Sequence, residues 1–320
     1  MRLVLFEGPG AGQAARLGVL RDDGVHDVSR ATVGLSAQTG QQLMREVIDE
    51  FDDLRALIEE VADAVLPLPL DVVRLRPPLP RPGKILCCVG NYWEHAEREP
   101  RPLNMFLKNP DAVIGPGDTI VLPEFTETPI ADGPGPYVFQ HEAELALVIK
   151  GPARNVSQED WRRAVFGVTA IVDVSARADG RGTWRQGSWM GKSFDTFAPI
   201  GPCITTLDEI GDPNSLHVRF WNNGDLRHDY VTDDMEHRVP QLIEFATGIM
   251  TLHSGDVIAC GTNHEGLGPL QDGETCVIDI EKVGRMTLHV HDPLKREWER
   301  GIYMGPNSTT PEAVRLRGGG

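Results

Sequence analysis

Apolar positions in the first eighty residues change from strand-like runs to a helical repeat. The two short apolar runs predict strands, at residues 2–6 and 15–20. Apolar residues then recur every three to four positions from Thr39 to Val65, which is the spacing of an amphipathic helix. Proline-rich text over 66–84 favours extended chain and predicts a boundary. We therefore expect a small N-terminal α/β domain over residues 1–78.

Beyond this boundary the pattern is one of short apolar runs separated by glycine and proline turns. Predicted strands lie at 85–89, 105–108, 119–122, 142–149, 166–174, 256–259, 276–280 and 284–291. Charged and apolar residues alternate over 142–149, which indicates a half-buried strand. Predicted helical segments are few, at 91–99, 157–164 and 239–251. The pattern predicts an α+β, mostly β fold, with a second domain over 79–304, a loop over 126–137 and a disordered tail over 305–320.

Charge narrows the classes of partner. The chain of 320 residues has 31 lysines and arginines against 47 aspartates and glutamates, a formal net charge of −16. Nucleic acids and anionic membranes attract basic surfaces, so neither is an expected partner. No apolar run approaches the roughly 20 residues that span a bilayer, and the first residues contain no signal-peptide core. We expect a cytoplasmic protein that binds neither membranes nor nucleic acid.

The cysteines give little chemistry. Five are present, an odd number, with no CxxC spacing. Buried thiols in a reducing compartment are the expected state, and a nucleophilic cysteine is the weaker alternative. The chain also contains no P-loop and no GxGxxG after a predicted strand, so the sequence gives no support for nucleotide binding.

Three carboxylates form the most informative pattern. Glu142 and Glu144 share one face of the predicted strand and lie about 7 Å apart there. Two like charges at this spacing suggest a divalent cation between them, although an exposed edge strand is the alternative. Asp173 lies inside an apolar strand, where it needs a hydrogen-bonding partner or a metal. Carboxylate ligands suit Mg²⁺, Mn²⁺ or Ca²⁺ better than Zn²⁺.

Six segments of the chain, in this order, match one known family. They read CVGNYWEHAERE (88–99), FLKNPDAVIGPGDTIVLP (106–123), HEAELALVI (141–149), IVDVSAR (171–177), GKSFDTFAPIGP (191–202) and GDVIACGT (255–262). Over about residues 84–293 the chain resembles the fumarylacetoacetate hydrolase family, including its diketo-acid hydrolases, acylpyruvases and diene-dioate isomerases. Agreement in type, order and spacing makes the resemblance specific, whereas a single Glu-x-Glu motif would carry no weight.

The resemblance implies a mixed β-roll in the large domain and, in most members, a homodimer. It implies Mg²⁺, sometimes Mn²⁺ or Ca²⁺, bound by Glu142, Glu144 and Asp173. Family members bind the α-keto acid or β-diketo end of a small acid on the metal. They then cleave a C–C bond, decarboxylate, hydrate or isomerise the substrate.

Four further positions match the family's substrate site. Lys192 corresponds to a lysine near the metal that stabilises negative charge or relays protons. Lys108 and Arg177 are candidates for contacts to the substrate carboxylate or the metal shell, and a guanidinium binds carboxylates well. Thr262 is placed where the family's Gly-Thr pair approaches the substrate.

His95 is the candidate base that activates water, in a segment that is a lid in relatives. There the histidine pairs with a glutamate three residues later, but position 98 here is arginine. On a helix Glu99, four residues on, would reach His95, so we assign Glu99 as its orienting partner. Arginine at position 98 is one departure from the family pattern. A second lies after the Gly-Thr pair, where polar residues over 263–265 replace the family's proline and glycine.

The sequence therefore predicts a Mg²⁺-dependent hydrolase that cleaves a C–C bond in a diketo or acylpyruvate-type acid through a metal-stabilised enolate. A decarboxylase, hydratase or isomerase of a 2-oxo acid on the same fold is the alternative. A non-catalytic acidic binding protein is a third hypothesis, which the complete carboxylate set and Lys192 disfavour.

Overall fold

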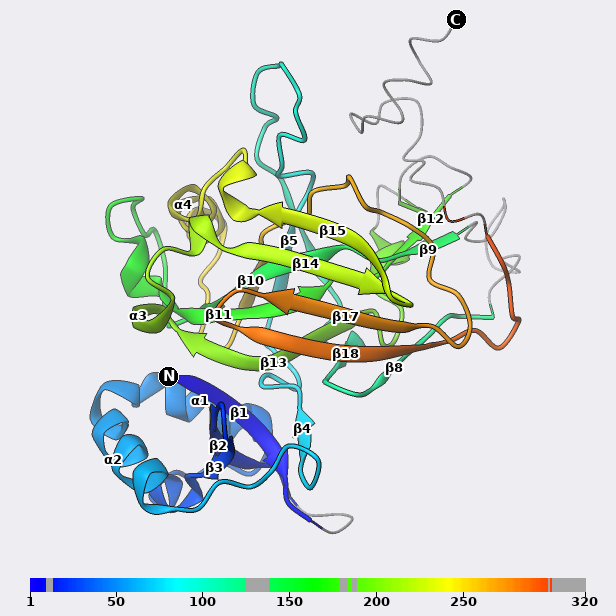
Figure 1. Ribbon diagram of the computed structural model, residues 1–320. Helices are drawn as coiled ribbons and strands as arrows, with labels where there is room; N and C mark the ends of the chain where they lie inside the picture. Colours follow the sequence, from blue (N-terminus) through cyan, green and yellow to red (C-terminus); the bar gives the residue numbers. More distant parts are fainter. Residues whose placement is uncertain (10–13, 125–137, 179–182, 186–188, 299, 301–320) are drawn as a thin grey trace, which may run out of the picture.

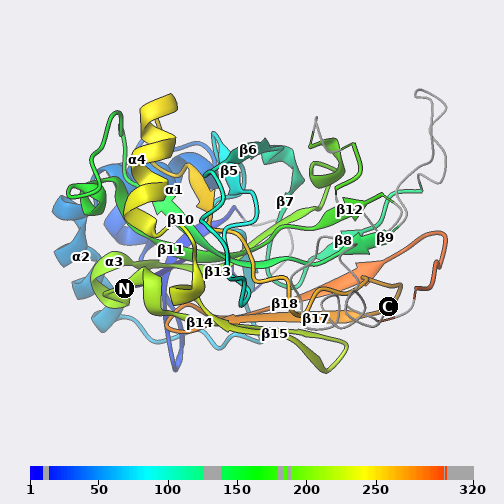
Figure 2. The same ribbon diagram turned by 90° about the horizontal axis from the view of Figure 1, so that it is seen from above.

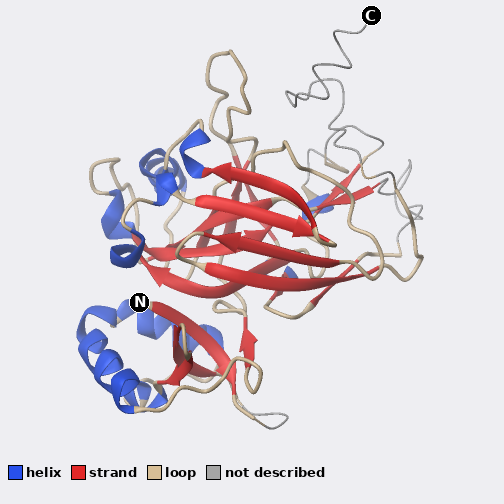
Figure 3. Cartoon of the chain, viewed as in Figure 1, coloured by secondary structure: helices blue, strands red, loops and turns tan. Residues whose placement is uncertain are grey.

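The computed structural model describes residues 1–9, 14–124, 138–178, 183–185, 189–298 and 300. Two packed β-sheets form the centre of this part of the chain, with helices at their margins (Figure 1, Figure 3). The α+β, mostly β fold is confirmed. The predicted loop over 126–137 and tail over 305–320 lie outside the described residues.

The larger sheet joins the N-terminal strands to strands from the middle and later parts of the chain. Its order is β3 (Gly24–Asp27), β2 (Arg16–Arg21), β1 (Arg2–Glu7), β13 (Ala198–Thr206), β11 (Val165–Val172), β10 (Ala143–Ile149), β16 (Val257–Ala259), β5 (Ile85–Cys88) and β6 (Met105–Lys108). Two short strands pair beside this path, β4 (Arg74–Arg76) with β1 and β7 (Val113–Ile114) with β13. Because β1 pairs with β13, the N-terminal segment continues the sheet of the large domain. The division at residue 78 stays a prediction.

The second sheet packs against the larger one. Its order is β15 (Asp225–Val231), β14 (His217–Asn222), β17 (Thr275–Ile280), β18 (Gly284–His291) and β8 (Thr119–Val121). Along β14 and β17 buried and half-buried residues alternate, as expected for strands with one face on a core. The views in Figures 1 and 2 show this sheet lying over β10, β11 and β13. A separate two-stranded ribbon joins β12 (Ser175–Arg177) to β9 (Val138–Gln140).

Strand β10 forms where a strand was predicted, but it is buried on both faces, so the predicted half-burial is wrong. It lies between β11 and β16, and cores cover both sides of the sheet. Leu145 and Leu147 pack into the core that includes the second sheet, whereas Ala146 and Val148 pack into the core that includes the N-terminal helices. Glu144 shares the face of Ala146 and Val148. The charged positions of the alternation therefore point into a buried polar centre rather than to solvent.

The helices agree with the sequence pattern in place but not always in extent. They are α1 (Gly40–Asp49), α2 (Phe51–Ala64), α3 (Leu207–Ile210) and α4 (Val239–Ile249). Single 3₁₀ turns are η1 (Ser29–Thr32), η2 (Pro110–Ala112), η3 (Trp161–Ala164), η4 (Met190–Lys192), η5 (Pro213–Ser215) and η6 (Thr232–Asp234). The helix predicted over 39–65 is interrupted at Glu50, whose backbone leaves the helical region. The helix predicted over 157–164 is reduced to η3.

The helical turn predicted over 91–99 is also wrong. Tyr92 makes an isolated bridge to Met235, and Glu94 and His95 have left-handed backbones with φ of 52° and 58°. All five cysteines are buried and free, as predicted. Among the described residues, no helix is both long and apolar enough to cross a bilayer.

Candidate metal centre

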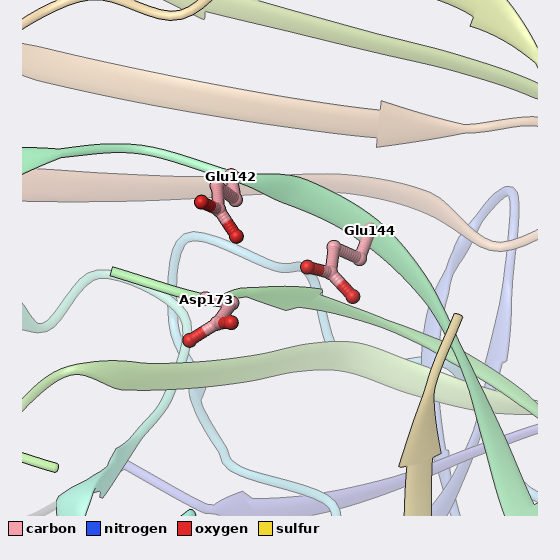
Figure 4. Close-up of side chains that lie close together, drawn as sticks. All are labelled: Glu142, Glu144 and Asp173. Carbon is pink, nitrogen blue, oxygen red and sulfur yellow. The ribbon is translucent and has the colours of Figure 1, made fainter. Parts of the chain in front are cut away.

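Two adjacent strands bring the three carboxylates together. Glu144 lies at the start of β10, Glu142 directly precedes this strand, and Asp173 directly follows β11. The antiparallel pairing of Ala143 with Val172 places these strand ends side by side, and Asp173 N donates to Glu142 O at 2.8 Å. One oxygen from each side chain lies within 4.8 Å of the others. Figure 4 shows the three side chains pointing toward one another.

Three buried cations surround this cluster. Lys192, in η4, places its Nζ 2.6 Å from both Glu142 Oε2 and Asp173 Oδ2. Lys108, on β6, donates to Asp173 Oδ1 at 2.5 Å, and Arg177, on β12, donates to Glu142 Oε1. All of these side chains are at most 10% exposed. Three positive charges therefore accompany three carboxylates in a site that excludes bulk water.

Neighbouring opposite charges keep Glu142 and Lys192 ionised. Burial alone would raise the pKa of Glu142, but Lys192 and Arg177 outweigh it and lower that pKa below the usual range. Burial alone would lower the pKa of Lys192, and Asp173 and Glu142 reverse this and raise it. Glu142 and Lys192 are thus both charged at neutral pH.

Glu144 is the exception, and it carries the evidence for a metal. Its Oε2 accepts a hydrogen bond from Gly261 N at 2.7 Å, while its Oε1 is buried with no hydrogen-bond partner among the described residues. Burial raises the pKa of Glu144 well above its usual value, and the charges of Asp173 and Glu142 add to this rise. A divalent cation among the three carboxylates would give the free oxygen a partner and would favour the ionised form of Glu144. The donor set, oxygen only, fits Mg²⁺, Mn²⁺ or Ca²⁺.

The backbone at Gly261 is what directs an N–H to Glu144. Gly261 has φ of +87°, in the left-handed region, and a Cβ there would lie 3.1 Å from Asn91 Cβ. An alanine at 261 would adopt this conformation only with strain. The same glycine follows β16, so the edge of the sheet places a backbone donor beside the carboxylates.

Gly261→Ala is expected to destabilise the protein by about 1 kcal/mol or more, because φ is positive. It is also expected to weaken Mn²⁺ binding by about 10- to 100-fold, because the donor that orients Glu144 moves. Thermal denaturation and Mn²⁺ titration measure the two effects. Gly273→Ala is the matched control, since Gly273 has φ of +77° with open space around its Cβ position and no contact to the carboxylates. Equal Mn²⁺ affinity in both variants would contradict the role of Gly261.

Lys108 and Arg177, predicted to contact the substrate or the metal shell, form hydrogen bonds to protein groups in this structure. Lys108 Nζ also donates to the backbone oxygens of Val174, at 3.3 Å, and Lys192, so all three of its N–H groups are used. Arg177 also donates to Gln140 Oε1 at 3.0 Å and to Thr183 Oγ1 at 3.2 Å. Both side chains brace the carboxylate cluster.

The other predicted residues lie apart from one another. Thr262 is buried next to Gly261 and donates to Asn263 O at 3.2 Å. His95 is 80% exposed, and its Nε2 lies 3.4 Å from Oε1 of Glu265. Glu99 is exposed, and the helix that was to join it to His95 is absent. Sequence reasoning missed Glu265, whose only signal was the polar stretch after Gly261-Thr262.

Comparison with known proteins identifies relatives of this chain. A family model described as fumarylacetoacetate (FAA) hydrolase C-terminal matches residues 84–291. The chain is 32% identical over 292 residues to a maleylpyruvate hydrolase of Aquipseudomonas alcaligenes, covering 86% of this chain and 96% of that one. It is 30% identical over 302 residues to a mitochondrial oxaloacetate tautomerase of Bos taurus, covering 89% and 90%.

A solved structure extends the likeness to three dimensions. The crystal structure of maleylpyruvate hydrolase from Sphingobium sp. SYK-6, in complex with manganese(II) and pyruvate, superposes with a TM-score of 0.77. Sequence identity is 36%, and the match covers 91% of this chain and 99% of that one. These relatives are enzymes that act on small molecules. With a family model matched over about two thirds of its length, the chain belongs to the fumarylacetoacetate hydrolase family.

Proposed function

We propose that this protein is a divalent-metal-dependent hydrolase that cleaves a C–C bond in a small acylpyruvate-type acid. The observation that carries the proposal is the buried cluster of Glu142, Glu144 and Asp173, in which one oxygen of Glu144 has no partner. Two relatives named maleylpyruvate hydrolase, one crystallised with manganese and pyruvate, support the reaction class.

Glu142, Glu144 and Asp173 would hold the cation, which we propose to be Mg²⁺, with Mn²⁺ or Ca²⁺ as substitutes. When bound, the metal would supply Lewis-acid stabilisation of the negative charge that develops on the substrate oxygens. Lys108 and Arg177 keep the carboxylates in place, and the protein thereby avoids the cost of reorganising them during the reaction. Thr262 stays a candidate for substrate contact.

His95 supplies the acid–base chemistry, and Lys192 supplies positive charge. His95 takes a proton from water, and the hydroxide oxygen bonds to the acyl carbonyl carbon of the substrate. As this bond forms, the C=O electron pair moves onto the carbonyl oxygen. When C=O re-forms, the bond from that carbon to the neighbouring CH₂ breaks, and its electron pair stays on the three-carbon fragment, which takes the proton from His95 and becomes pyruvate. Lys192, ionised between Glu142 and Asp173, provides a fixed positive charge beside the reacting oxygens.

Product analysis tests the proposal. The purified protein with Mg²⁺ is incubated with acylpyruvates, maleylpyruvate, oxaloacetate and 2-hydroxydienoates in H₂¹⁸O, and products are identified by mass spectrometry. We expect pyruvate and a second acid that carries one ¹⁸O in its new carboxylate, and loss of activity in EDTA. Carbon dioxide release or double-bond migration, without hydrolysis of any substrate, would contradict the hydrolase.

An isomerase or tautomerase is the second candidate, with decarboxylase and hydratase activities in the same group. The observation that favours it is Arg98, at the position where family resemblance leads us to expect the partner of His95. Isomerisation and tautomerisation use no attacking water, so neither needs a histidine positioned to activate one. The bovine relative is named an oxaloacetate tautomerase. The ¹⁸O experiment separates the two candidates because tautomerisation forms no new carboxylate.

The homodimer implied by the family resemblance and the cytoplasmic location implied by the sequence also stay proposals. Sedimentation of the purified protein tests the first, with a mass of about twice that of the chain expected.

A further inference from the structure

Two neighbouring loops exchange histidine–glutamate contacts. One follows β5 and contains Glu94 and His95, and the other follows β16 and contains His264 and Glu265. Strands β5 and β16 are parallel neighbours, so both loops leave the sheet at the same edge. Glu94 Oε1 accepts from His264 N at 2.8 Å and contacts its Nδ1.

The second contact of this exchange joins His95 to Glu265. Nε2 of His95 lies 3.4 Å from Oε1 of Glu265, which is buried with no hydrogen-bond partner among the described residues. Burial raises the pKa of Glu265, and the nearby imidazole of His95 opposes that rise. Catalytic hydrogen bonds that are long in a free enzyme often shorten when substrate binds.

The segment over 88–99, a lid in relatives, offers His95 no other carboxylate contact among the described residues. Arg98 donates twice to the carboxylate of Glu236, which also accepts from Arg101 Nε at 2.7 Å. Glu97 and Glu99 are exposed. Arg98 therefore anchors the lid segment to Glu236 and cannot serve as the acceptor that a histidine needs.

The backbone of the lid segment is held so that His95 faces the second loop. Glu94 and His95 both have left-handed backbones, a conformation that costs free energy in residues other than glycine. Trp93 N donates to Asp234 O at 3.1 Å and Glu94 N donates to Asp234 Oδ2 at 3.2 Å. Asp234 Oδ2 also accepts from Asn263 Nδ2 at 3.2 Å, so one aspartate links the two loops.

We propose that Glu265 is the positioning residue for His95, taking the place of the glutamate that position 98 lacks. His95 Nε2–H donates to Glu265, which leaves Nδ1 unprotonated and available to take a proton from water. The Glu94–His264 contact holds the two loops side by side. The two departures from the family pattern, Arg98 and the polar stretch over 263–265, are thus complementary. This inference rests on the proposed function, in which His95 is the base.

The test compares Glu265→Gln, His95→Ala and the double variant in the full-length protein with Mg²⁺ and the best acylpyruvate substrate. We expect Glu265→Gln to lower kcat about 10- to 100-fold with KM and Mn²⁺ affinity unchanged. We expect the double variant to be no slower than His95→Ala, because the two residues act as a unit. Glu97→Gln, an exposed glutamate of the same loop, is the matched control and keeps wild-type kcat.

The pH profile separates positioning from general damage. The charged groups near His95 are Glu94, Asp234, His264 and Glu265. Removing the negative charge of Glu265 disfavours protonated His95, so the acidic limb of kcat is expected to move to lower pH in Glu265→Gln. A residue with a merely structural role would lower stability or metal affinity and leave that limb in place.

The outcomes distinguish this inference from the proposed function. A kcat within twofold of wild type for Glu265→Gln, while His95→Ala is inactive, would overturn the role of Glu265 alone. A loss in Glu99→Gln instead would return that role to Glu99. Full activity of His95→Ala would overturn the assignment of His95 as the base, and with it the mechanism proposed above.

Discussion

Glu144→Gln is expected to raise the melting temperature of the metal-free protein and to abolish the further rise that Mn²⁺ gives the wild type. Without a bound metal, the Glu144 carboxyl is buried beside Asp173 and Glu142, which disfavours its ionised form. Glutamine removes this carboxyl and still accepts from Gly261 N. With Mn²⁺ at about 100 times its Kd, binding to the folded state adds about 2.7 kcal/mol to wild-type stability. The variant loses that gain, and its kcat/KM falls more than about 100-fold.

The effect on the metal-free protein depends on pH. Since the pKa of Glu144 is raised, the folded protein binds this proton more tightly than the unfolded chain does. Stability contributed by Glu144 is therefore present below the ordinary carboxyl value of 4.5 and is lost as pH rises above it. Glu144→Gln removes this loss, so the advantage of the variant in EDTA grows with pH. Glu60→Gln, at an exposed position of α2, is the control. A lower melting temperature for Glu144→Gln in EDTA at pH 8 would contradict this electrostatic account.

Lys192→Met is expected to destabilise the metal-free protein by about 3–5 kcal/mol, because it leaves Glu142 and Asp173 buried without their shared cation. Mn²⁺ is expected to reduce this difference in stability between the variant and the wild type, since the ion supplies positive charge to the same carboxylates. Activity with Mn²⁺ present should still fall about 100- to 1,000-fold, because the fixed charge beside the reacting oxygens is gone. Denaturant unfolding with and without Mn²⁺, together with steady-state kinetics, measures both effects.

Lys150→Met is the matched control for Lys192→Met. Lys150 pairs with Asp52 at 2.7 Å, but the two side chains are 30% and 85% exposed. Loss of such a surface pair costs about 0–1 kcal/mol. A similarly small effect for Lys192→Met in EDTA would show that Lys192 does not compensate the carboxylates.

The carboxylate cluster could be predicted because its signal is local. Glu142 and Glu144 are two residues apart on a strand, and Asp173 is a charge within an apolar run. What surrounds them depends on distant segments. The contact of Lys108 with Asp173 joins residues 65 positions apart, and that of Arg177 with Glu142 joins residues 35 apart. The ordered family segments placed these cations near the site without giving their partners.

The errors have the same origin. Alternating charge along β10 resembles a solvent-facing strand, because the sequence does not reveal that a core lies on each side. The helical assignment over 91–99 failed because the segment is held by Asp234 and Glu236 rather than by its own hydrogen bonds. Assigning Glu99 to His95 depended on that helix. The contact with Glu265 requires the parallel pairing of β5 with β16, which no local pattern encodes.

Anomalous diffraction from crystals grown with Mn²⁺ tests whether the three carboxylates bind a divalent cation. Data collected above and below the manganese absorption edge locate the ion without reference to the protein. We predict one strong peak bonded to carboxylate oxygens of Glu142, Glu144 and Asp173, with Oε1 of Glu144 among its ligands, and no such peak in Glu144→Gln. A fully occupied manganese site elsewhere, with this cluster bridged only by Lys192, Lys108 and Arg177, would contradict this prediction.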